Sequence, residues 1–188
     1  MSTQSLMSIG YLREYVTQQL GLDGLTTINA PTINKNDVKI SGYWIAQLRY
    51  SLFARPQNQI IVACVNSDKW DRGLLGIFAN QGQPKIEHSA VCNLTDEHKI
   101  VEDVMHNIDI YPDDPSHIGL KNDALLDCTC VTHTGYTQTI ITTSNSAKES
   151  KLRNLIYAVN ATAHAIAKTT QDETLLDYMN YFPRVSNE

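Results

Sequence analysis

The chain has no excess of positive charge. Fifteen Lys and Arg residues stand against twenty Asp and Glu residues, which gives a formal net charge of −5 at pH 7. A protein with this balance has no global positive field to attract the phosphates of a nucleic acid. A nucleic-acid partner would therefore require a local basic patch.

Long apolar runs are also missing. No segment approaches the roughly 18 consecutive apolar residues of a membrane-spanning helix. The first residues, MSTQSLMSIGYLREY, lack the basic start and apolar middle of a signal peptide. We therefore expect a cytoplasmic protein that has no membrane partner.

Cysteine is scarce, with Cys64, Cys92, Cys128 and Cys130 as the four examples. In the cytosol such residues are usually reduced and often buried. Cys128, Cys130 and His133 partly match a metal-binding pattern, but a structural zinc site needs a fourth ligand and a wider first pair of cysteines. We favour strand packing for these residues and expect neither a metal nor a cofactor.

The apolar residues that are present predict a helix near the N-terminus. They recur every three or four positions, at Leu6, Ile9, Leu12, Val16 and Leu20, and Gly21 follows as a stop signal. A polar connector with Pro31 comes next. Residues 1–37 are therefore predicted to be a helical extension and its connector.

The next part of the chain has strand patterns. VKISGYWIAQLRYSLF alternates, and QIIVACVNS is a continuous apolar run of the length of a central strand. RGLLGIFANQGQPKIEHSAV predicts two strands joined at residues 80–84, where Gly82 and Pro84 favour a turn. ALLDCTCVTH and TQTIITTS form a last predicted pair, separated near Gly135.

Helical patterns stand between and after the strands. TDEHKIVEDVMHN predicts a short amphipathic helix, and SAKESKLRNLIYAVNATAHAIAK has the strongest helical stripe, over residues 152–166. Asp172 is a good N-cap for a tail helix that ends before Pro183. This order predicts an α+β domain over residues 38–169, built on a compact, mainly antiparallel β-barrel, with a tail helix in residues 170–188.

Three segments resemble the PemK/MazF group of toxin-fold proteins. SGYWIAQL is similar to the opening strand of that family, and ARPQNQIIVACVNSD is similar to its Arg-Pro pair followed by an apolar strand. GLKNDALLDCTC resembles the late Gly-Leu-x-x-Asp-Ser segment of the family, which leads into another strand. The resemblance implies an SH3-like, PemK-like barrel with a C-terminal helix, to which this chain adds an N-terminal helix.

The resemblance also implies a function. Proteins of this family are toxins of toxin–antitoxin pairs, which cut single-stranded RNA without a metal and often form homodimers. The reaction needs a cation beside the phosphate and an acid–base pair within hydrogen-bond reach. Arg55 matches the arginine that precedes proline and is the expected phosphate contact, although an Arg-Pro pair at the entrance of a strand also occurs as a loop anchor. Single-stranded RNA and a protein antitoxin are the implied partners, with a second copy of the chain.

The late strand supplies the other candidate catalytic residues. Strand alternation puts Asp127, Thr129, Val131 and His133 on one face and the two cysteines on the other. His133 is a candidate acid–base group because its unperturbed pKa lies near neutrality, and Asp127 is a second candidate, with Thr129 as a binding residue. Asp127 and His133 are too far apart for a direct hydrogen bond. The alternative interpretation is an ordinary polar strand face.

The segment DKWDRG is a candidate binding site of another kind. Lys69, Trp70 and Arg72 place an aromatic ring among cations, a combination that suits stacking on a nucleic-acid base. Asp68 and Asp71 offset these charges, so a surface turn is the alternative that we favour.

A non-catalytic function is the alternative to RNA cleavage. The late strand has Asp127 and Thr129 where the family often has arginine and then aspartate, and the uncharged Thr132 falls near a further family arginine. This pattern favours a protein-binding module on the same scaffold, with the N-terminal helix or the stripe over residues 152–166 as its docking surface. A structural or virion-associated protein is a third hypothesis.

Overall fold

The computed structural model describes residues 8–25, 37–50, 59–79, 85–94, 99–106, 126–134, 137–144 and 150–182. Its elements, in chain order, are α1 (Ile9–Gln19), β1 (Ile40–Tyr50), β2 (Gln59–Ser67), β3 (Asp71–Ala79), β4 (Lys85–Asn93), α2 (Lys99–His106), β5 (Leu126–Thr134), β6 (Thr137–Ser144), α3 (Ser150–Thr170) and α4 (Glu173–Tyr181). For β5 and β6 the description covers the backbone and its pairing.

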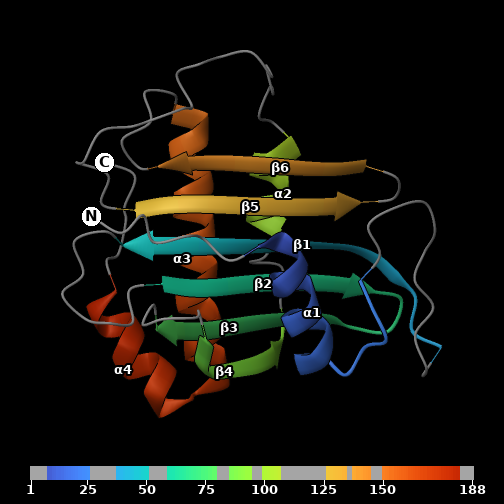
Figure 1. Ribbon diagram of the computed structural model, residues 1–188, viewed down its shortest axis with the longest axis horizontal. Coiled ribbons are helices and arrows are strands. Elements are labelled where there is room, and N and C mark those ends of the chain that lie inside the picture. The colour runs from blue at the N-terminus through green and yellow to red at the C-terminus, as the bar shows by residue number, and fades with distance from the viewer. Residues whose placement is uncertain are drawn as a thin grey trace.

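The six strands form one sheet in the order β4-β3-β2-β1-β5-β6. Every neighbouring pair is antiparallel, and β1 lies in the interior between β2 and β5. The predicted α+β domain on an antiparallel sheet is confirmed. The closed barrel is not shown, because β4 and β6 lie at the two ends of an open sheet (Figure 1).

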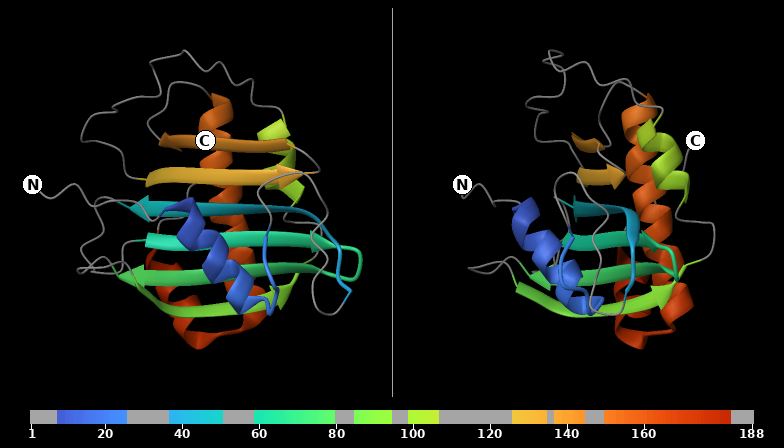
Figure 2. Two further views of the ribbon diagram at one scale, coloured as in Figure 1. Left: turned by 45° about the vertical axis from the view of Figure 1, so that its right-hand side comes forward. Right: turned by 90° about the vertical axis from the view of Figure 1, so that its right-hand side faces the viewer.

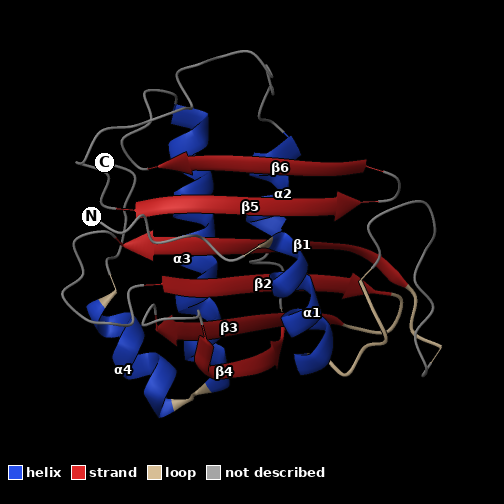
Figure 3. Ribbon diagram, in the orientation of Figure 1, coloured by secondary structure: helices blue, strands red, loops and turns tan. Residues whose placement is uncertain are grey.

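Helices cover both faces of this sheet. We call the face under α1 the front face and the opposite face the back face (Figures 2 and 3). The long helix α3 crosses the strands on the back, where α2 and α4 flank it (Figure 1). A strand covered on both faces is apolar at nearly every position, and this explains the continuous run in β2, which is buried from Gln59 to Val65.

The back face carries the larger core cluster. Trp44, Ala46 and Leu48 of β1 point into it, and the buried stripe of α3 covers them. The members of this stripe are Leu155, Ile156, Val159, Ala163 and Ile166. The predicted stripe is therefore confirmed as a core element of the fold.

The front face carries a second core cluster. Leu12 and Val16 of α1 pack there against Tyr43 and Ile45 of β1 and against Phe78 of β3. Thus α1 shields the front face of the sheet from water, and α3 shields the back face. The stripe of α3 is wrong as a docking surface, because it is buried against the sheet. Docking through the N-terminal helix stays a prediction, and it would use the outward side of α1, because the apolar side covers the sheet.

Local signals at two helix ends act as the sequence predicts. Gly21 has a φ of 66°, a left-handed conformation that glycine adopts without strain just after a helix. The Asp172 side chain accepts a hydrogen bond from the Leu175 backbone N–H at 3.0 Å and caps α4.

Gly76 lies where the front face has no room for a side chain. It is the register partner of Ile61 in β2. A Cβ atom at Gly76 would lie 2.7 Å from the Cγ2 methyl of Ile61, which is fully buried and branched at Cβ. The missing side chain therefore allows close packing in the second core cluster.

We expect Gly76→Ala to lower the free energy of unfolding by about 1–3 kcal/mol, the usual cost of an overpacked core. Urea denaturation followed by circular dichroism measures this change. Gly24→Ala is the matched control, because no atom lies within 4 Å of the added Cβ there. Equal stabilities of the two variants would contradict the packing described for Gly76.

Candidate functional site

A polar row on β1 lies beside the predicted site residues of β5. The register pairs Arg49 with Asp127, Gln47 with Thr129 and Tyr43 with His133. Directly opposed residues share a face of an antiparallel sheet. The three candidate site residues of β5 therefore lie next to Arg49, Gln47 and Tyr43 of β1. The sequence analysis named none of these three as a site residue.

Tyr43 stands at one end of this row and is bound by α1. Its side chain is 2% exposed, and the Arg13 guanidinium donates a hydrogen bond to its hydroxyl. Burial raises the pKa of the Tyr43 phenol above its ordinary value, and Arg13 opposes part of that rise. The Tyr43 phenol therefore stays neutral near pH 7 and has the Arg13 cation beside it. Tyr43 is also the register partner of His133.

Gln47 and Gln59 form a buried amide pair in the middle of the row. Each is 1% exposed, and Gln47 Nε2 donates to Gln59 Oε1 at 2.7 Å. Gln47 Oε1 and Gln59 Nε2 have no hydrogen-bond partner among the residues that the structure describes. A buried amide that lacks part of its hydrogen bonding costs stability, so this pair is the least expected feature of an otherwise apolar front face.

The predicted catalytic residues do not come together. Asp127 and His133 lie six positions apart on β5, and a rise of about 3.4 Å per residue separates their Cα atoms by about 20 Å. The two residues therefore lie at opposite ends of the row, opposite Arg49 and Tyr43. Arg55, the predicted phosphate contact, lies outside the described residues.

The two cysteines and the histidine that partly match a metal-binding pattern lie on different faces of the strand. Cys128 and Cys130 are the register partners of Leu48 and Ala46 on the back face, whereas His133 is the partner of Tyr43 on the front face. Within the described parts of the chain, no group of three His, Cys, Asp or Glu residues could hold a metal ion.

The DKWDRG segment contains the connection between β2 and β3, residues 68–70, and the first three residues of β3. Ser67 organises it, since the Trp70 backbone N–H donates to Ser67 Oγ at 2.9 Å and that hydroxyl donates to the Trp70 carbonyl at 2.7 Å. The Arg72 guanidinium carbon lies 4.5 Å from the centre of the Trp70 ring, which also packs against the second core cluster. Lys69 is exposed. Base stacking on Trp70 stays a prediction, and it would compete with Arg72 for the ring.

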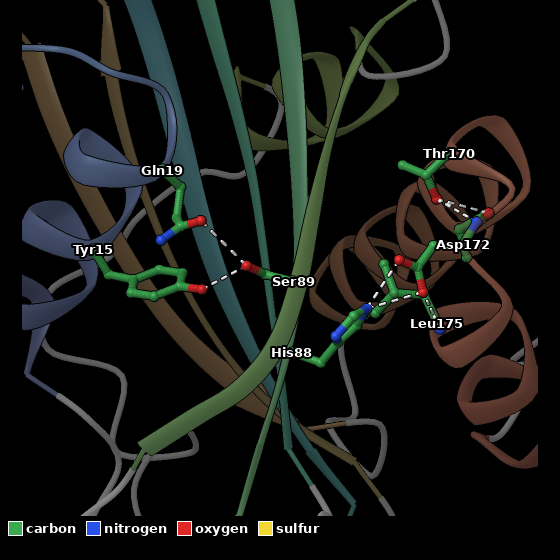
Figure 4. Close-up of polar contacts among 8 residues, drawn as sticks. Tyr15, Gln19, His88, Ser89, Thr170, Asp172 and Leu175 are labelled. Atoms are coloured by element: carbon green, nitrogen blue, oxygen red, sulfur yellow. Dashed lines mark hydrogen bonds and ion pairs between the residues drawn. The ribbon is translucent and has the colours of Figure 1, made fainter.

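The structure adds a polar contact that the sequence did not suggest. His88 Nε2 of β4 lies 2.9 Å from both carboxylate oxygens of Asp172, which caps α4. On the other side of the strand, Ser89 Oγ lies 2.6 Å from the Tyr15 hydroxyl of α1 (Figure 4). Two consecutive residues of β4 therefore bind helices on opposite faces of the sheet. The sequence carries no signal for this, because 84 positions separate His88 from Asp172.

Comparisons with known proteins supply no template for these sites. No protein-family model matches the chain, and no curated protein matches it. None of the helices in the described segments is long and apolar enough to cross a membrane.

The Asp172 contact predicts a pH-dependent contribution to stability. The pKa of this carboxyl lies below its ordinary value, first because the Leu175 backbone N–H bonds to it and second because His88 does. A depressed folded-state pKa means that the carboxylate stabilises the fold above its unfolded-state pKa. This stabilisation is lost as the pH falls through the folded-state value.

We expect Asp172→Ala to lower the free energy of unfolding near neutral pH by about 0.5–2 kcal/mol, the range for a lost N-cap. The difference from wild type should shrink as the pH falls below the carboxyl pKa. Urea denaturation at a series of pH values measures both effects. Asp177→Ala, at an exposed position of the same helix, is the control and should show a smaller loss. A constant Asp172→Ala difference across the acid range would refute the assigned role.

Proposed function

We propose that this protein is a non-catalytic binding module whose partner is another protein. The observation that carries the proposal is the separation of Asp127 from His133 along β5. A phosphoryl-transfer site needs its cation, acid and base around one phosphate group. Asp127 and His133 lie about 20 Å apart along β5, so they cannot act as acid and base on the same phosphate group.

The neighbours of these two residues support the same conclusion. Asp127 lies opposite Arg49, a residue of opposite charge, and cross-strand pairs of this kind stabilise sheets. His133 lies opposite Tyr43, whose hydroxyl is already bound by Arg13. The register thus pairs each of these two residues of β5 with a different residue of β1, at opposite ends of the row.

The front face of β5 and β6 is the proposed docking surface. Val131 and Ile140 are register partners near the middle of the two strands, and the flanking pairs are polar: Asp127 with Ser144, Thr129 with Thr142, and His133 with Gln138. An apolar centre with a polar rim is the usual composition of a protein–protein interface. Among the described helices, α1 is the one on this face, and it crosses β1 to β4 (Figure 1).

We expect Thr129→Arg to abolish capture of the partner, because a long cation would stand beside the apolar centre of the surface. Tagged wild-type and variant proteins are incubated with native lysate of the source cells, and the bound proteins are quantified by mass spectrometry. Thr169→Arg, at an exposed position of α3 on the back face, is the matched control and should retain the partner. Circular dichroism verifies that both variants are folded.

Two outcomes would contradict this docking surface. One is a partner that Thr129→Arg and Thr169→Arg retain equally well. The other is the absence of any protein enriched by wild type over a tag-only control.

A second candidate function is metal-independent cleavage of single-stranded RNA on a PemK/MazF-like barrel scaffold. The observation that favours it is the Arg13 guanidinium at the Tyr43 hydroxyl, beside the position of His133. A cation next to an imidazole is a minimal arrangement for phosphate chemistry, and Arg55 would supply a further cation. In this proposal a protein antitoxin would be the natural inhibitor, and the active form would be a homodimer.

If the protein cuts RNA, His133→Ala should lower the cleavage rate by about 10²–10⁴-fold, the usual contribution of a general acid or base. Arg55→Ala should also slow cleavage, while His88→Ala on β4 should leave the rate unchanged. The measurement is fragment release from mixed single-stranded RNA in the presence of a chelator. Intact RNA after incubation with folded wild-type protein would remove this second function and leave the binding module.

A further inference from the structure

We propose that the outer edge of β6, which pairs with no strand in the described part of the chain, pairs in antiparallel fashion with β6 of a second copy, so that one sheet continues through both copies. This inference does not depend on the proposed binding of another protein. It follows from the different character of the two edges of the sheet. An edge strand presents unpaired backbone N–H and C=O groups, and proteins normally block such edges against further pairing.

The β4 edge carries several blocking features. Its register with β3 is irregular between Ile77 and Phe78, and an irregularity of this kind bends an edge strand away from further pairing. Lys85 and Glu87 add charge to the strand, and both are exposed. Figure 4 shows the remaining feature, the contacts of His88 and Ser89 with helices on both faces.

The β6 edge carries none of these features in its sequence or its register. Its eight residues, TQTIITTS, include no charged residue, no proline and no glycine. Six of the eight are threonine or isoleucine, which have high strand propensity. Its pairing with β5 runs without a register shift from Thr137 to Ser144. No strand among the described residues pairs with its other side.

A second copy fits this edge because β6 can serve as its own partner. Two antiparallel β6 strands related by a two-fold axis normal to the sheet would bring Ile140 or Ile141 to the axis, with threonines around it. Such an interface is isologous and closed, as in most homodimers. The strand has no charge, so neither register places like charges opposite one another, although each chain has a net charge of −5. A strand without charge also offers nothing that would select a charged foreign peptide.

The two-fold axis has a consequence for the rest of the molecule. Because it is normal to the sheet, the front faces of both copies lie on the same side. The two β5–β6 surfaces then adjoin each other across the new strand pair, and α3 of each copy remains behind its own strands. The paired edge is thus closed to further strands, while the blocked β4 edges become the ends of the shared sheet.

The test uses the full chain in sedimentation velocity over a dilution series. We expect wild type to sediment as a species with twice the 21.1 kDa chain mass. Ile140→Lys and Ile140→Glu should each sediment as a monomer, because residue 140 lies at the axis or one position from it in either register, so each variant brings two like charges close together across the strand pair. An equimolar mixture of the two variants should restore the dimer, and only folded chains could do so.

Asn93→Lys on the β4 edge is the matched control and should leave the dimer intact. Three results would overturn the proposal. Wild type could be monomeric at every concentration, which would leave the β6 edge to a strand of another protein. A dimer could form with undiminished stability in both Ile140 variants, or the mixture of variants could fail to associate.

Discussion

The fold depends on a sheet whose central strands must be hidden from water on both faces. Trp44 and Leu48 of β1 face the back, while Tyr43 and Ile45 of the same strand face the front, and all four are buried. Burial of one large apolar side chain contributes about 1.5–3 kcal/mol, so an uncovered face would forfeit a large part of the stability of the domain. The position of α3 behind the sheet and of α1 in front of it follows from this requirement. The N-terminal helix is therefore a layer of the structure, in contact with the second core cluster.

The same arrangement limits the chemistry of the front face. Polar residues are tolerated beside a buried strand only where they meet complementary groups. Arg13 meets Tyr43 across the α1 interface, Gln47 meets Gln59 between β1 and β2, and Arg49 lies opposite Asp127. This row explains why residues that resemble catalytic groups in the sequence do not form one cluster. The register spreads them along the length of β1 and β5, whereas a reaction centre would gather them around one point.

The two edges of the sheet lie in different surroundings because of the strand order. Since β5 pairs with β1, the β5–β6 hairpin extends the sheet away from the meander of β1 to β4. The β4 edge is held between α1 and α4 through Tyr15 and Asp172. The hairpin lies at the other end of the sheet, where its front face and outer edge are the parts on which association with other chains is proposed.

The sequence alone determined the features that depend on local periodicity. The stripe of α3, the continuous apolar run of β2, the cap at Asp172 and the alternation of β5 were all predicted, because each reports which side of a segment avoids water. The positions of segments relative to one another were decided only by the tertiary structure. Nothing local indicates that β5 joins β1, that α1 covers the front face, or that His88 meets Asp172. These choices depend on which combination of segments covers both faces of the sheet at once. How much apolar surface is buried depends on the arrangement of the whole chain. That arrangement places β5 next to β1, and with it Asp127 opposite Arg49 and His133 opposite Tyr43.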